Sequence, residues 1–102
     1  TFVEAARVFA ERMLENHDTP EVRLATAFRM TTSRQPTEAE LAVLLRALKR
    51  SLAYYQENSQ QADEFRNAGE YPPADGLAAI DVAAYGNVLN MILNTDEAIT
   101  RE

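Results

Sequence analysis

The stretch Pro36–Glu57 constrains the fold of this chain more than any other, because it specifies a long helix in two independent ways. Thr37 and Glu40 have the spacing of a capping box, in which each side chain accepts a hydrogen bond from the other residue's backbone N–H. Apolar residues then recur at steps of three and four, which places them on one helix face. They are Leu41, Leu44, Leu45, Leu48 and Leu52. We expect this helix to be the spine of the core.

Three further segments have helical periodicity: Phe2–Glu15, Pro20–Thr31 and Leu77–Leu93. Thr19 is placed to cap the second of them, with Pro20 at the first helical position, where a missing N–H costs nothing. Beyond the spine, a helical rhythm either resumes at Ala62 or continues unbroken to about Asn67. The loop Glu70–Gly76 follows, because its Pro-Pro pair excludes a helix.

Expected burial follows from the same periodicity. In the second helix, Val22, Ala25 and Phe28 are expected to face inward, with Leu24 as a further candidate. In the first helix, the charged residues are expected to lie outside the core. Arg7 and Glu11 would then form an exposed pair worth only a few tenths of a kcal/mol.

The predicted fold is a compact all-α bundle of about four main helices with short loops and a short C-terminal helical turn. We place the turn at Asp96–Arg101 and expect Asn94 to cap it. Alternation of period two never extends beyond four residues, so no sheet is expected. Residues 1–102 are read as a single domain, since this length suits one small core.

Charge and cysteine content exclude several classes of function. The net charge is −6, from 10 Lys and Arg against 16 Asp and Glu, which disfavours binding to nucleic acid or to anionic membranes. The absence of cysteine removes disulfides, thiolate metal sites and a cysteine nucleophile. No apolar run approaches the ~20 residues that span a bilayer.

Residues that could carry chemistry are sparse. The single histidine, His17, lies in a polar interhelical segment beside Asp18, without a nucleophile nearby in sequence, and is read as a solvated loop residue. No HExxH, EF-hand or phosphate-loop pattern is present. Tyr55 and Tyr85 fall on apolar stripes and are read as core or rim residues. We therefore expect no catalytic residue, metal site or cofactor in this chain, and the question of an enzyme stays open.

Four segments share a pattern with a known family. The chain reads F-V-E-A-A-R at Phe2–Arg7, A-F-R at Ala27–Arg29, R-Q-P-T-E-A-E-L at Arg34–Leu41 and L-N-T-D-E-A-I-T-R-E at Leu93–Glu102. Together they resemble the C-terminal part of an uncharacterised planctomycete family, domain of unknown function 1553. The chain departs from that pattern at Ala98, where the family has Phe, and at Tyr85, where a Trp is common.

The resemblance covers nearly the whole chain and implies a context rather than a mechanism. Proteins of this family are large, look periplasmic or otherwise extracytoplasmic, and commonly carry a cytochrome-c-like haem domain upstream. No catalytic residue is assigned to the family, so none is transferred to this chain. The expected role is therefore a C-terminal accessory or interaction domain of a larger, redox-linked protein, with any haem c bound elsewhere in that protein.

Two other roles stay open at this point: one wall of an enzyme active site completed by another domain, and a free-standing helical adaptor. The chain opens in helical rhythm without a methionine, so we expect a fragment of a longer protein. The apolar faces of the first and last helices are broader than a four-helix core of this size needs. We therefore expect an interface at Phe2 and Val3, covered by upstream domains, another protein or a second copy in a homodimer.

Overall fold

The computed structural model describes residues 2–70 and 72–95, and these contain five α-helices and no strand. The helices are α1 (Phe2–Asn16), α2 (Pro20–Thr32), α3 (Glu38–Glu57), α4 (Ser59–Arg66) and α5 (Ala79–Leu93). The predicted all-α bundle is confirmed. The turn expected at Asp96–Arg101 lies outside the described residues.

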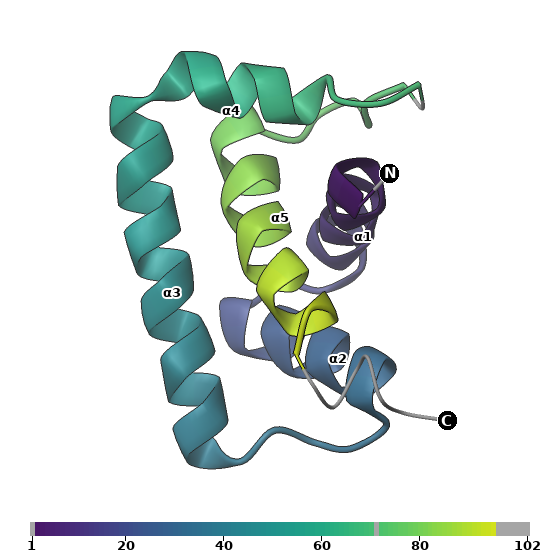
Figure 1. The fold of residues 1–102 in the computed structure, drawn as a ribbon, viewed down its shortest axis with the longest axis vertical. Helices are drawn as coiled ribbons and strands as arrows, with labels where there is room; N and C mark the ends of the chain where they lie inside the picture. The colour runs from purple at the N-terminus through teal and green to yellow at the C-terminus, as the bar shows by residue number, and fades with distance from the viewer. Residues whose placement is uncertain (1, 71, 96–102) are drawn as a thin grey trace.

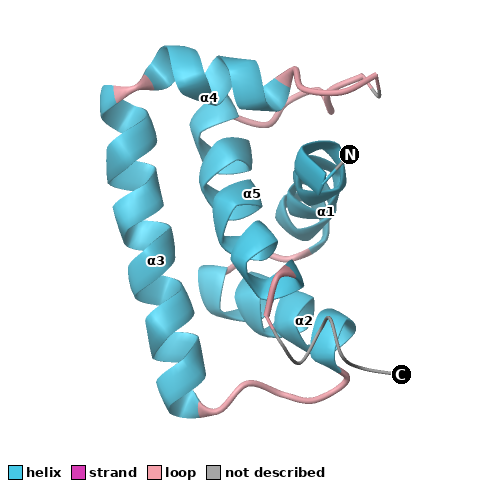
Figure 2. Ribbon diagram, viewed as in Figure 1, coloured by secondary structure: helices cyan, strands magenta, loops and turns pink. Residues whose placement is uncertain are grey.

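The last helix, α5, runs through the middle of the bundle and contacts each of the other four. Figure 1 shows α3 along one side of it and α1 along the other, with α2 across one end and α4 across the opposite end. The chain between α4 and α5 returns past the start of α1, as the pink segments of Figure 2 show. Because α5 is surrounded, it can be apolar on nearly all sides.

This central position corrects one sequence-based expectation. The breadth of the apolar surface on α5 suggested that a packing partner was missing, yet the helix uses that breadth within the bundle. Its buried residues occupy most of its circumference: Val82, Ala83, Ala84, Tyr85, Gly86, Val88, Leu89 and Ile92. Small residues let neighbours approach closely, and a Cβ added at Gly86 would lie 2.4 Å from the Phe65 ring of α4.

The break between α3 and α4 explains why five helices replace the four expected. The chain leaves helical geometry at Asn58, whose side-chain amide donates to the Tyr54 carbonyl at 2.8 Å and so occupies an acceptor at the end of α3. The chain then restarts as α4, which buries Ala62 against the core. If α3 continued without this break, Phe65 would not pack against α5.

The buried residues of α3 confirm the expected spine of the core, whereas the buried face of α2 differs from the expected one. Leu44 and Leu48 of α3 are buried, and the other leucines of that stripe pack partly buried against the same cluster. In α2 the buried face is formed by Leu24, Ala27 and Phe28, whereas Val22 is exposed and Ala25 only half-buried. Val22 precedes Leu24 by two residues, a rotation of about 200° around the helix, so the two cannot face the core together.

Candidate functional site

The first polar cluster lies at the start of α1 and is buried, which contradicts the expectation that Arg7 and Glu11 are solvated. Arg7 is fully buried and Glu11 nearly so. Arg7 Nη1 lies 2.9 Å from Glu11 Oε2, and Arg7 Nε donates to the Ala68 carbonyl at 3.0 Å. Glu11 Oε2 also accepts from the Ala74 N–H at 3.1 Å. The pair therefore fastens both ends of the loop between α4 and α5 to α1.

This cluster has the properties of a structural element and not of a binding site. Every polar contact named above joins Arg7 or Glu11 to the protein itself. The loop closes over them at Gly69, where φ is +86° and an added Cβ would lie 2.4 Å from Glu4 Cδ. The backbone fits there because glycine adopts positive φ without steric cost. No space is left for a ligand to reach the guanidinium.

The second polar cluster is the expected cap of α3. Thr37 Oγ1 accepts from the Glu40 N–H at 3.1 Å, and Glu40 Oε1 accepts from the Thr37 N–H at 2.8 Å. Arg34, which sequence reasoning did not connect with this cap, donates to both Glu40 carboxylate oxygens at 2.8 Å. The Arg34 hydrogen bonds, followed by that from the Thr37 backbone, lower the pKa of Glu40 to about 2.

Asn94 was also expected to cap a helix, and it contacts the helix that precedes it. Its side-chain amide donates to the Asn90 carbonyl at 2.8 Å, at the C-terminal end of α5. The turn that it was expected to begin lies outside the described residues. The interface expected at the start of α1 is described only at Val3, which is exposed; the Phe2 side chain lies outside the described part of the chain.

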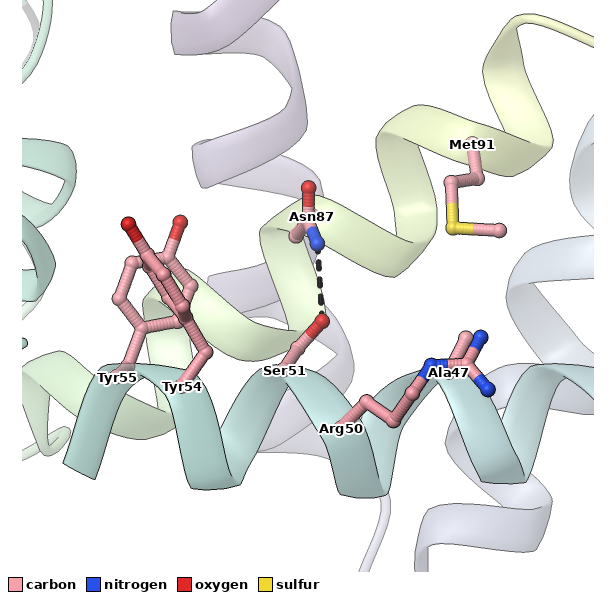
Figure 3. Close-up of a pocket in the computed structure, with 7 residues that line it drawn as sticks. All are labelled: Ala47, Arg50, Ser51, Tyr54, Tyr55, Asn87 and Met91. Atoms are coloured by element: carbon pink, nitrogen blue, oxygen red, sulfur yellow. Dashed lines mark hydrogen bonds between the residues drawn. The ribbon is translucent and has the colours of Figure 1, made fainter. Parts of the chain in front are cut away.

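A surface pocket between α3 and α5 brings side chains of different chemistry together. It has a volume of about 370 Å³. Figure 3 shows two tyrosines at one end and Met91 at the other, with a hydrogen bond between Asn87 and Ser51 crossing the middle. The lining residues are Ala47, Arg50, Ser51, Tyr54, Tyr55, Asn87 and Met91.

Local contacts fix the polar part of this pocket. Asn87 Nδ2 donates to Ser51 Oγ at 2.9 Å, which orients the Ser51 hydroxyl within a nearly buried position. The Tyr54 hydroxyl donates to Gln61 Oε1 of α4, and its ring meets that of Tyr55 edge to face at 5.1 Å. Burial, followed by the neighbouring Tyr54, raises the pKa of Tyr55. The raised pKa keeps the Tyr55 hydroxyl neutral, and the hydrogen bond of Tyr54 orders this aromatic end of the pocket.

A second, apolar pocket of about 260 Å³ continues from Met91 towards the end of α5. Phe28, Leu44 and Ile92 contribute core side chains to it, and Val43 closes it from the α3 side. Met91 lines both pockets, and we name the surface that the two pockets occupy beside α3 and α5 the α3/α5 groove. Met91 is exposed on the groove, whereas the neighbouring Ile92 is buried.

Sequence reasoning missed this groove, although a signal for it exists. Val43, Ala47, Arg50 and Tyr54 recur at steps of four, three and four, so they form a second stripe on α3 beside the leucines. Tyr85, in contrast, is buried as expected and accepts a hydrogen bond from Arg23 at 3.1 Å. His17 is half-buried and contributes its backbone carbonyl to Arg23.

Within residues 2–70 and 72–95, no group of three or more His, Asp or Glu side chains is arranged to hold a metal ion. In the same ranges no helix combines the length and apolarity needed to cross a membrane. No family model matches the chain, and no curated protein or solved structure matches it either.

Proposed function

We propose that this chain is a protein-interaction module whose α3/α5 groove receives a segment of a partner. The observation that carries the proposal is where its exposed apolar side chains lie. Six large hydrophobic residues are exposed in the described part of the chain, and three of them line the groove. These are Val43 at 47% exposure, Tyr54 at 48% and Met91 at 45%. Exposed apolar side chains gathered in a depression are typical of sites that bind another protein.

The chemistry of the groove supports binding over catalysis. A hydrolytic or proton-transfer site requires an acid or base within hydrogen-bond reach of a nucleophile. The mixed pocket of Figure 3 is lined by no carboxylate and no histidine, and its only aliphatic hydroxyl, that of Ser51, accepts from Asn87. Among the described residues of the apolar pocket the one charged group, Glu40, is held by Arg34 and the α3 backbone.

The wider setting of the module is proposed from the family resemblance. In that setting the chain is an accessory domain of a larger, extracytoplasmic, redox-linked protein, and haem c is bound by another domain. The exposed Val3 on α1 supports a second contact, made with upstream domains of the same polypeptide. This contact and the α3/α5 groove lie on different helices, so one could be occupied while the other stays open.

Selection from a display library of randomised helical peptides tests the role of the groove. We expect selected peptides to bind the isolated domain and to lose binding to Met91→Asp, because an aspartate removes the apolar contact that joins the two pockets. Met30→Asp is the matched control, since Met30 is also exposed but lies on α2 outside both pockets. Selection of no binder, or of binders equally indifferent to both substitutions, would contradict the proposal.

A further inference from the structure

The charges beside the groove are asymmetric, although the protein as a whole carries a net charge of −6. Arg46 and Arg50, one helical turn apart, are exposed on the α3 side, and Arg50 lines the mixed pocket itself. Within the described part of the chain, neither of them forms an ion pair, whereas Glu40 of the apolar pocket is paired with Arg34. Among the described residues, the α5 side contributes the uncharged Asn87, Met91, Ile92 and Thr95.

We infer that the partner segment is an acidic amphipathic helix, with carboxylates along the side that faces α3. This inference rests on the proposed function and specifies the chemistry of its partner. An acidic helix would supply the counter-charges that Arg46 and Arg50 lack. Complementary charges of this kind select among partners and speed their encounter, while the apolar contacts supply affinity.

The dimensions of the groove set the length of that helix. Its α3 side runs from Val43 to Tyr54, eleven residues along a helix, which corresponds to about 16 Å or three turns. A helix bound in such a groove inserts apolar residues at spacings of three, four and seven. The groove has an apolar end at Val43 and Met91 and an aromatic end at Tyr54 and Tyr55, so two anchors about eleven residues apart on the bound helix would fill both ends.

The middle of the groove adds a polar requirement. Asn87 donates one of its amide hydrogens to Ser51, and an amide carries two. Arg50 lies on the same stripe between the two apolar ends. A carboxylate placed between the two anchors of the bound helix can therefore reach Arg50, and it lies near a second donor at Asn87.

Nucleic acid fits this surface less well than an acidic helix. A phosphate backbone is bound by cationic side chains placed along its path. Here the two cations, Arg46 and Arg50, are confined to one side, both ends of the groove are apolar or aromatic, and the protein as a whole carries a net negative charge. The combination of separated apolar anchors and a one-sided positive edge matches the two faces of an amphipathic helix.

The display selection described above also tests this inference when the peptides are about 14 residues long, slightly more than three helical turns. We expect the binders to be enriched in Asp and Glu and to carry large apolar residues about eleven positions apart. Binders that are lost with Met91→Asp but are neutral or basic would overturn the inference and leave the proposed function standing. Failure to recover any groove-dependent binder would overturn both.

Charge reversal on the protein provides the second readout. Arg50→Glu should weaken binding of the best acidic peptide by at least about tenfold. A version of that peptide in which Lys replaces the acidic residues should bind the Arg50→Glu variant better than it binds the wild-type protein. Arg12→Glu is the control, because it makes the same charge change at an exposed site on α1, across α5 from α3. Equal losses in the two variants, or a concentration-dependent dimer that Met91→Asp abolishes, would overturn the assignment of an acidic foreign helix.

Discussion

Two Arg–Glu pairs in this domain have nearly the same geometry and very different surroundings. Arg7 Nη1 and Glu11 Oε2 are 2.9 Å apart with side-chain exposures of 0% and 7%. Arg34 Nη2 and Glu40 Oε2 are 2.8 Å apart with exposures of 40% and 38%. Water can replace a lost partner only in the second pair, so the two should differ greatly in the cost of breaking them. Distance alone therefore says little about what an ion pair contributes.

The largest effect is expected for Glu11→Ala. Removing this carboxylate leaves the buried Arg7 guanidinium without its closest counter-charge and the Ala74 N–H without its acceptor, which should reduce stability by about 3 to 5 kcal/mol. Urea unfolding followed by circular dichroism measures the loss. The double variant Arg7→Met/Glu11→Leu should be less destabilised than Glu11→Ala, because it buries no charge. A loss under about 1 kcal/mol in the single variant would contradict the role of the buried pair.

The loop fastened by the buried pair offers a second, smaller test. Gly69→Ala should cost about 1 to 2 kcal/mol for placing an L-residue at φ +86°, plus the displacement of the Glu4 side chain. Gly76→Ala is the matched control, since φ is +82° there and nothing lies within 4 Å of the added Cβ. Thermal unfolding should show Gly69→Ala to be the less stable of the two. Equal stabilities would mean that the Glu4 contact contributes nothing.

Around the exposed pair, losing the Thr37 cap should reduce stability more than losing the Arg34–Glu40 ion pair. Thr37→Ala removes the acceptor for the Glu40 N–H and should destabilise the domain by about 0.5 to 2 kcal/mol. Thr37→Ser keeps a hydroxyl at that position and should retain most of the stability. Chemical unfolding of both variants checks the expectation, and wild-type stability in Thr37→Ala would contradict it.

The smallest change in stability is expected for Arg34→Gln, where the clear readout is protonation. The pKa of Glu40 should rise from about 2 towards 4.5, because the Arg34 hydrogen bonds are the main cause of its lowering. A lowered folded-state pKa gives stability that is present above pH 4.5 and lost as the pH falls towards 2. Carboxyl carbon NMR titration measures the shift directly. A Glu40 pKa that stays near 2 in the variant would show that the backbone bonds dominate.

The same contrast explains what could be predicted from the sequence. The capping box of Thr37 and Glu40 is local, since both hydrogen bonds join residues three positions apart, and it was foreseen in full. The burial of Arg7 depends on Ala68, and that of Glu11 on Ala74, each more than sixty residues away. Periodicity within α1 carries no information about such partners, so both residues were placed on the surface.

The groove was missed for a related reason. Helical spacing identifies which residues share a face, and it placed Leu44 and Leu48 correctly in the core. It does not say how far two neighbouring helices diverge, and that separation decides whether Val43 and Met91 are covered or exposed. The five-helix arrangement depended in the same way on a single residue, Asn58, at which the direction of the chain changes.

The central place of α5 has a consequence for how the protein is made. A ribosome produces α1 to α4 before α5, and each of these four helices packs against α5 in the finished domain. Until α5 has left the exit tunnel, the apolar faces of α1 to α4 lack the helix against which they pack in the finished domain. The domain therefore completes its fold only after α5 has emerged, and the apolar faces of α1 to α4 stay exposed until then.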